Sequence, residues 1–102
     1  MIALTVCYKS NGAFDAAYYY TKHLPLVAEK LTAFGLKNTE VRKILGTPAG
    51  EPAPYQLIAT LYFEDADTLQ KAMASVAGQA VVADIPNFFD GMPDLMIGQI
   101  VA

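Results

Sequence analysis

The chain has 102 residues, the usual size of one domain, so we expect a single domain over residues 1–102. The seven basic residues are scattered and the net charge is −3, which argues against a nucleic-acid partner. No apolar run approaches the ~18 residues of a membrane helix, and the first residues do not read as a secretory signal, so we expect a cytoplasmic protein with no membrane partner.

The first half of the chain predicts a strand, a helix and a second strand. Residues 1–8 alternate between two mostly apolar rows, which is typical of a central strand covered on both faces. Apolar residues at spacings of three and four, with Tyr20 among them, predict a helix over about residues 15–34. Pro25 cannot donate a helical hydrogen bond, so we expect a kink or break near His23 and Leu24. Residues 36–46 read as the second strand.

The second half predicts a strand, a helix and a strand. A Pro/Gly loop over residues 47–54 leads to the strongest strand, residues 55–63. Asp65 is a suitable N-cap for an amphipathic helix that ends near Gly78, and residues 79–83 can add a turn. An aromatic loop over residues 84–91 precedes the last strand, residues 95–101.

The order β-α-β-β-α-β predicts the α+β class and a ferredoxin-like sandwich: a four-stranded antiparallel sheet with both helices on one face. Nothing in the chain would cover the other sheet face. Hydrophobic residues make up 54% of the chain and charged residues 17%, against ~45–50% and ~25% in ordinary domains. We therefore expect a homodimer in which two sheets pack face to face.

His23 is the first candidate for chemistry because it is the only histidine and so the only side chain that titrates near neutral pH when unperturbed. It lies beside the expected helix break and is flanked by phenols. It can act as a general acid or base. The alternative is a structural role, in which His23 bonds carbonyls freed at the kink or the loop after Asp84.

The chain resembles the EthD-like family, named for ethyl tert-butyl ether degradation, within the dimeric α+β barrel superfamily. The resemblance rests on Phe14 and Asp15 followed by Tyr18, Tyr19 and the run His23, Leu24, Pro25. Three later segments also resemble the family pattern and follow along the chain in the order expected of a member: residues 58–65, 84–88 and 96–101. Phe89 departs from the pattern, since many relatives have Thr or Ser there.

The resemblance implies a dimeric α+β barrel, with the helix break over the mouth of a cavity and the Asp84 loop nearby. It implies a reaction less firmly: superfamily relatives include polyketide cyclases, lactone isomerases, decarboxylases and cofactor-independent monooxygenases. Small bacterial members often carry a "reductase" label. Because a fold does not determine a function, the function has to be inferred from the residues of the site.

Six further residues are candidates beside His23, each with a structural alternative. Asp84 can orient His23 or simply cap a short segment. Asn87 and Phe88 can line the pocket, and a buried aromatic is more often core. Tyr19 is the best phenol candidate for substrate binding. Tyr8 and Tyr62 can also reach a ligand, although packing across a dimer is the alternative for both.

No metal or cofactor is expected. One histidine and one cysteine per chain do not build an ordinary metal site, and Cys7 reads as a small buried hydrophobe. The Gly46–Gly50 stretch is not followed by a helix, so it is not a nicotinamide fingerprint, which is a physical reason to distrust the "reductase" label. A haem-binding barrel with one axial histidine stays open as a weaker option.

The functional hypothesis is a cofactor-independent enzyme that acts by proton transfer on a small hydrophobic compound bearing a carbonyl or phenol group. Isomerisation, cyclisation or oxygen-dependent oxidation would each fit. The last of these would make the protein an oxidoreductase. His23 would be the acid/base, Asp84 its orienter, and Tyr19 or Tyr62 a hydroxyl donor. The alternative is a non-catalytic binding or accessory protein of a degradative pathway.

Overall fold

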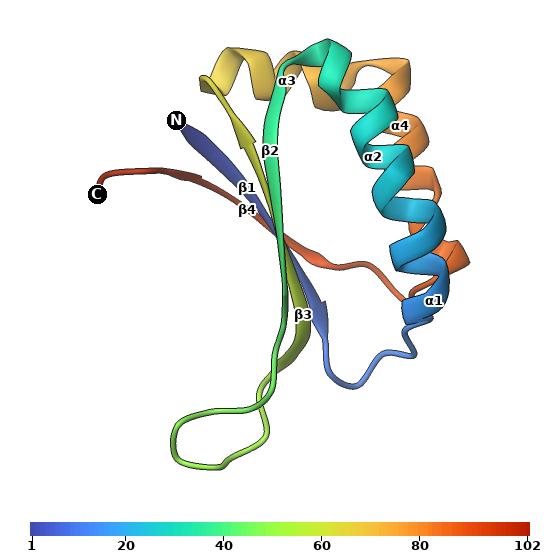
Figure 1. Ribbon diagram of the computed structural model, residues 1–102, viewed down its shortest axis with the longest axis vertical. Coiled ribbons are helices and arrows are strands. Elements are labelled where there is room, and N and C mark those ends of the chain that lie inside the picture. Colours follow the sequence, from blue (N-terminus) through green and yellow to red (C-terminus); the bar gives the residue numbers. More distant parts are fainter.

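The computed structural model describes all residues from 1 to 102 as four strands on one side of a layer of helices (Figure 1). The elements in chain order are β1 (Ile2–Lys9), α1 (Ala16–Tyr18), η1 (Tyr19–His23), α2 (Leu24–Leu31), η2 (Thr32–Phe34), β2 (Leu36–Lys43), β3 (Tyr55–Phe63), α3 (Ala66–Ala74), α4 (Val76–Ala83), η3 (Ile85–Asn87) and β4 (Asp94–Gln99).

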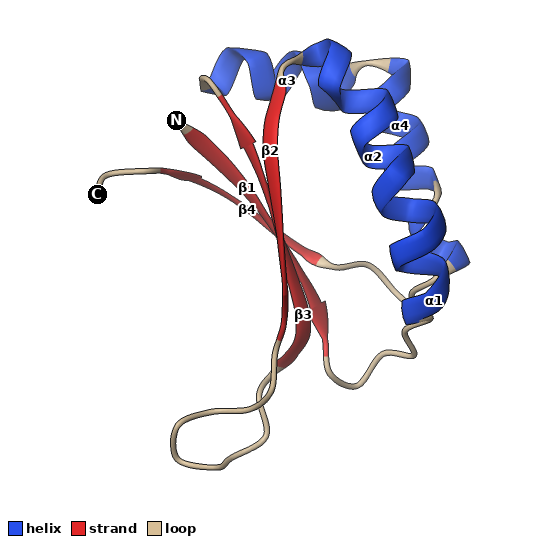
Figure 2. Ribbon diagram, in the orientation of Figure 1, coloured by secondary structure: helices blue, strands red, loops and turns tan.

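The sheet has the order β2-β3-β1-β4, and every neighbouring pair is antiparallel. Leu4 of β1 lies opposite Leu61 of β3 and Ile97 of β4, which fixes the register across the centre. All helices cover the same face of this sheet (Figure 2). The ferredoxin-like α+β fold expected from the order of elements is confirmed.

The first helix changes its hydrogen-bond register where a break was expected. Asp15 caps it by accepting a hydrogen bond from the Tyr18 amide, and α1 runs directly into the π-helix η1. The Leu24 amide donates to the Tyr19 carbonyl five residues back, and Pro25 follows at the start of α2. The wider turn accommodates the proline, which has no amide hydrogen, while the helix continues.

The π turn also corrects one expectation about the helix face. Tyr20 was counted in the apolar face of the predicted helix, but the residue is 46% exposed, whereas Tyr19 is buried. A π turn rotates by less than the ~100° per residue of an α-helix. A period of about 3.6 residues, applied through this turn, therefore assigns the wrong tyrosine to the core face. The adjacent Tyr19 therefore takes the core position.

The helical segment after β3 is two helices where one helix with an added turn was expected. Asp65 caps α3 as predicted, by accepting a hydrogen bond from the Thr68 amide. Ser75 is extended, with a ψ of 163°, and its hydroxyl accepts from the Gly78 amide to start α4. A Cβ at Gly78 would collide with the Ala72 carbonyl, so glycine allows the second helix to turn this closely against the first.

The two faces of the sheet differ in what covers them. On the helix side lie the core residues Leu4, Val6, Tyr8, Leu57, Ala59, Leu61 and Phe63. The opposite face carries Ala3, Thr5, Cys7, Ile58, Thr60 and Tyr62, with Met96 of β4 in register beside Thr5. Nothing in the chain covers this face, as Figure 1 shows. No helix has the length and apolar content to span a membrane.

Candidate active site

His23 and Asp84 form a hydrogen-bonded pair at one end of the helical layer. His23 Nδ1 lies 2.9 Å from Asp84 Oδ2, although the two residues are 61 positions apart in the chain. The side chains are only 5% and 12% exposed. The pair is therefore a nearly buried imidazole and carboxylate held within direct proton-transfer distance.

The helix and the η3 segment hold the imidazole between aromatic rings. Tyr19 stacks on His23 from within the same π turn, with ring centroids 5.5 Å apart and planes 23° apart. The ring of Phe88, directly after η3, packs on the imidazole with ring centroids 4.4 Å apart. These contacts leave the imidazole little room to rotate.

Asp84, at the junction of α4 and η3, has hydrogen-bond donors on both carboxylate oxygens. Oδ1 accepts from the Tyr18 hydroxyl at 2.7 Å and from Asn87 Nδ2 at 2.9 Å. Oδ2 is left for His23 Nδ1. Because an ionised carboxylate only accepts hydrogen bonds, Nδ1 must carry the proton, and the unprotonated nitrogen of a neutral imidazole is then Nε2.

Burial and hydrogen bonding set the charges of the pair. Burial lowers the pKa of His23 below its ordinary value, and the carboxylate of Asp84 offsets only part of that effect. Partial burial raises the pKa of Asp84, but the hydrogen bonds from Tyr18, Asn87 and His23 outweigh it, so that this pKa is lowered. At neutral pH the pair is therefore a neutral imidazole beside an ionised carboxylate.

An apolar cavity of about 50 Å³ lies between the helices and the sheet, and His23 lines it. Of its 17 lining residues, 15 are hydrophobic, among them Tyr8 and Tyr19. Neither phenol donates a hydrogen bond within the chain, and no fully buried polar side-chain atom lacks a partner. Both hydroxyls and His23 Nε2 therefore keep accessible surface.

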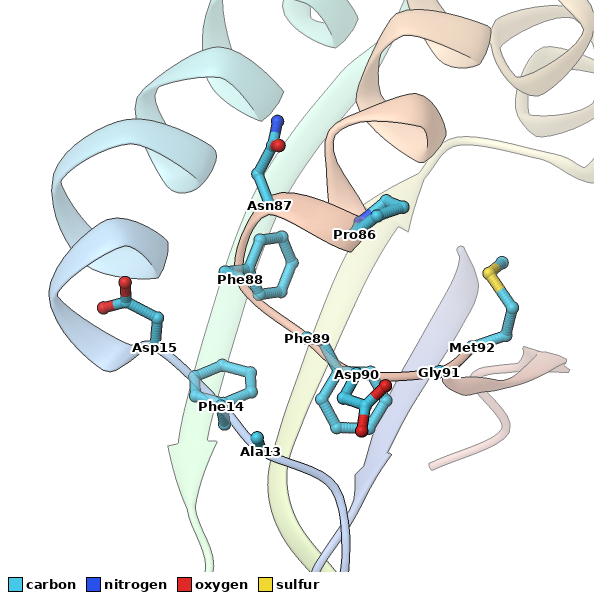
Figure 3. A pocket seen from close by; sticks show the side chains of 10 residues that line it. All are labelled: Ala13, Phe14, Asp15, Pro86, Asn87, Phe88, Phe89, Asp90, Gly91 and Met92. Carbon is cyan, nitrogen blue, oxygen red and sulfur yellow. The ribbon is translucent and has the colours of Figure 1, made fainter.

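The cavity approaches the surface at Met92 and Leu95. These two residues are 59% and 48% exposed, whereas the other lining residues are buried or half-buried. Outside lies an open groove of about 720 Å³, formed by residues 13–15 and 86–92. Figure 3 shows the side chains that line this groove, with Met92 at its right-hand edge. Met92 lines both the groove and the cavity.

The structure brings together most of the predicted site residues. Tyr8, Tyr19 and His23 line the cavity, Asp84 holds His23, and Phe88 packs on the imidazole. Asn87 is exposed, lies in the outer groove and contacts Asp84 instead of the cavity.

Tyr62 is separated from the other candidates because it lies on the opposite sheet face, where it pairs with Ala3. Sequence reasoning missed Tyr18, since nothing in the local pattern shows that its hydroxyl reaches a residue 66 positions away.

Neither a metal nor haem fits these residues. No group of three or more His, Cys, Asp or Glu side chains is placed to hold a metal ion. His23 lines a cavity of about 50 Å³, whereas pockets for drug-sized ligands measure roughly 300–1,000 Å³. The cavity is too small for a haem macrocycle, and a small phenol or ketone would enter it only with displacement of Met92 and Leu95, the exposed residues of its lining.

Comparison with known proteins identifies the family. The EthD domain model matches residues 12–92. An EthD-like protein from Ralstonia eutropha JMP134 has 28% identity and a TM-score of 0.85, over 99% of this chain and 92% of that one. An ethyl tert-butyl ether degradation family protein from Bacillus halodurans C-125 has 30% identity and a TM-score of 0.83, over 99% of both chains.

More distant structures share the fold alone. SnoaB, a cofactor-independent oxygenase from Streptomyces nogalater, has 8% identity and a TM-score of 0.63, over 99% of this chain and 93% of that one. No curated protein matches the chain in sequence. With most of its length matched by the family model, the chain belongs to the EthD family.

Proposed function

We propose that this protein is a cofactor-independent enzyme that moves a proton on a small hydrophobic compound bearing a carbonyl or phenol group. The observation that carries the proposal is the His23–Asp84 hydrogen bond at 2.9 Å, with the imidazole lining an apolar cavity. A neutral imidazole whose Nδ1 is held by a carboxylate is a general base at Nε2.

The proton would leave a C–H bond beside a carbonyl, or a phenol O–H, and move to His23 Nε2. The electron pair left behind would go to the substrate oxygen, as an enolate or phenolate. Asp84 would stabilise the imidazolium, and a phenol from Tyr8 or Tyr19 would donate to the charged oxygen. Return of the proton to another atom completes an isomerisation or cyclisation; an oxidation would need dioxygen as co-substrate.

The two phenols are suited to donation because they stay protonated. Burial raises the pKa of both Tyr8 and Tyr19 far above the ordinary value, and each is raised further by a neighbouring phenol. A neutral hydroxyl in an apolar cavity stabilises an oxyanion without competing for the proton on His23.

Among the fold neighbours, SnoaB is described as a cofactor-independent oxygenase and another structure as an antibiotic biosynthesis monooxygenase. With 8% and 12% identity these neighbours support a small-molecule role for the fold without naming a substrate.

The second candidate is a non-catalytic binding or accessory protein. The observation that favours it is the lining itself: 15 of 17 residues are hydrophobic, which suits retention of an apolar molecule without turnover. The two candidates differ in what they require of His23, since binding needs only a hydrogen-bond partner whereas catalysis needs a base.

Two further expectations complete the proposal. The uncovered sheet face, with Ile58, Tyr62 and Met96, favours a homodimer packed face to face, which light scattering would detect as twice the 11.0 kDa chain mass. The single cysteine, Cys7, favours a cytoplasmic location.

Proton exchange tests the proposed function before the natural substrate is known. A panel of small ketones, 1,3-diketones and phenols would be incubated with the protein in D₂O, and deuterium uptake at carbon followed by NMR. The proposal expects faster exchange for at least one compound, and a loss of about 10²–10⁴-fold in His23→Ala with affinity nearly unchanged. Saturable binding with no exchange above the buffer rate would favour the accessory protein.

A further inference from the structure

We propose that Tyr18 and Asn87 are positioning residues, which hold the Asp84 carboxylate so that it fixes His23 in the Nδ1–H form. Their effect on the imidazole can be tested without a substrate, whereas their effect on turnover rests on the proposed function above.

The carboxylate of Asp84 has its two oxygens assigned to different partners. Tyr18 and Asn87 both donate to Oδ1, at 2.7 and 2.9 Å, while Oδ2 accepts from His23 Nδ1. Rotation of the carboxylate would break all three contacts together. The two donors come from different elements, the end of α1 and the η3 segment, so the carboxylate is held from both.

Tyr18 reaches the imidazole by a second route. Its ring stacks on Phe88 with centroids 6.2 Å apart and planes 19° apart, and Phe88 packs on His23 at 4.4 Å. Tyr18, Asp84, His23 and Phe88 thus form a closed ring of contacts. Tyr18 therefore restrains the imidazole in two ways: through the Asp84 carboxylate at Nδ1, and through the Phe88 ring that packs on the imidazole face.

The chemistry of the donors suits this role. A phenol and an amide are neutral, so they stabilise the carboxylate without adding a cation that would compete with an imidazolium for it. Asp84 is the charged group that acts on His23, and the other titratable groups in contact with the pair are the phenols Tyr18 from α1 and Tyr19 from η1. The hydrogen bond to Asp84 raises the pKa of Tyr18, so its hydroxyl stays a donor at neutral pH.

Imidazole NMR of the 102-residue chain tests the proposal directly, because His23 is its only histidine and the signals need no assignment among others. The ¹⁵N shifts of Nδ1 and Nε2 distinguish the two neutral tautomers. Wild-type protein is expected to show the Nδ1–H form. Tyr18→Phe keeps the ring but removes the donor, and Asn87→Ala removes the second donor. Each is expected to lower the population of the Nδ1–H form, and the double variant to lower it most.

The matched control is Tyr20→Phe, which removes an exposed phenol two residues along the same helix that makes no side-chain hydrogen bond. It is expected to leave the tautomer unchanged. Circular dichroism would check that each variant is folded. A folded Tyr18→Phe/Asn87→Ala double variant with wild-type ¹⁵N shifts would overturn the proposal.

A kinetic arm separates this proposal from the proposed function. With a compound that exchanges in the D₂O assay, Tyr18→Phe is expected to lower kcat by about 10-fold, the loss that corresponds to one hydrogen bond of about 1.5 kcal/mol, with KM nearly unchanged. If the tautomer shifts in Tyr18→Phe but His23→Ala exchanges as fast as wild type, the positioning role stands and the proposed function fails.

Discussion

Tyr19 stacks on His23 within a single π-helical turn, with ring centroids 5.5 Å apart and planes 23° apart. The hydrogen bond from the Leu24 amide to the Tyr19 carbonyl, five residues back, widens the turn that holds both rings. The register change before Pro25 therefore places a phenol flat against the proposed base and turns both toward the cavity.

The hydroxyls of Tyr8 and Tyr19 are expected to matter for ligand binding and little for stability. Neither makes a hydrogen bond within the chain, so Tyr8→Phe and Tyr19→Phe should change the free energy of unfolding by less than about 0.5 kcal/mol. Affinity for an oxygen-bearing ligand should fall about 3–10-fold in at least one of them. Tyr62→Phe, on the opposite sheet face, is the control, and calorimetric titration would measure the affinities; equal affinity in all three variants would contradict the prediction.

Asp84→Ala is expected to destabilise the fold. The substitution removes the acceptor for three donors, and the Nδ1 group of His23 is too deeply buried to find water easily. The loss should be about 1–3 kcal/mol in urea denaturation. Asp90→Ala, at an exposed carboxylate with no side-chain hydrogen bond, should cost much less. Similar midpoints for the two variants would show that the Asp84 contacts contribute nothing.

Stability is expected to fall as the solution is acidified. The pKa of His23 is lower in the folded chain than the ordinary value of 6.5, so below about pH 6.5 the unfolded chain binds the proton more readily and unfolding is favoured. Asp84, also lowered from an ordinary 3.8, adds a second loss as the pH falls through about 4. Urea midpoints at pH 8, 6.5 and 5 would measure the first loss. In His23→Gln the urea midpoint should change less between pH 8 and pH 5 than in the wild type. An unchanged pH dependence would show that a group other than His23 titrates in this range.

Met92 is expected to control passage between the outer groove and the cavity, because it lines both. Met92→Trp should slow the association of a phenolic ligand by about 10-fold or more, while Met92→Leu, similar in volume, should leave the rate near wild type. Stopped-flow measurements of the ligand's fluorescence would give both rates. A tryptophan variant that binds as fast as the leucine variant would place the entrance elsewhere.

The sequence by itself determined the order of the elements and the fold class. Alternating apolar residues in the strands and the cap at Asp65 are local signals, and each falls where the structure has it. The excess of hydrophobic residues also anticipated a sheet face that the chain leaves uncovered. Even the proximity of His23 to the Asp84 loop followed from the family resemblance.

Only the tertiary structure decided which groups face the cavity. Strand alternation separates two rows of residues but does not say which row meets the helices, so Tyr8 and Tyr62 looked equivalent and lie on opposite faces. A uniform helical period selected Tyr20 in place of Tyr19, because the π turn exists only where packing of the aromatic rings and Pro25 favours it. The hydrogen bond from Tyr18 to Asp84 joins residues 66 positions apart, and contacts of that range leave no local pattern in a sequence.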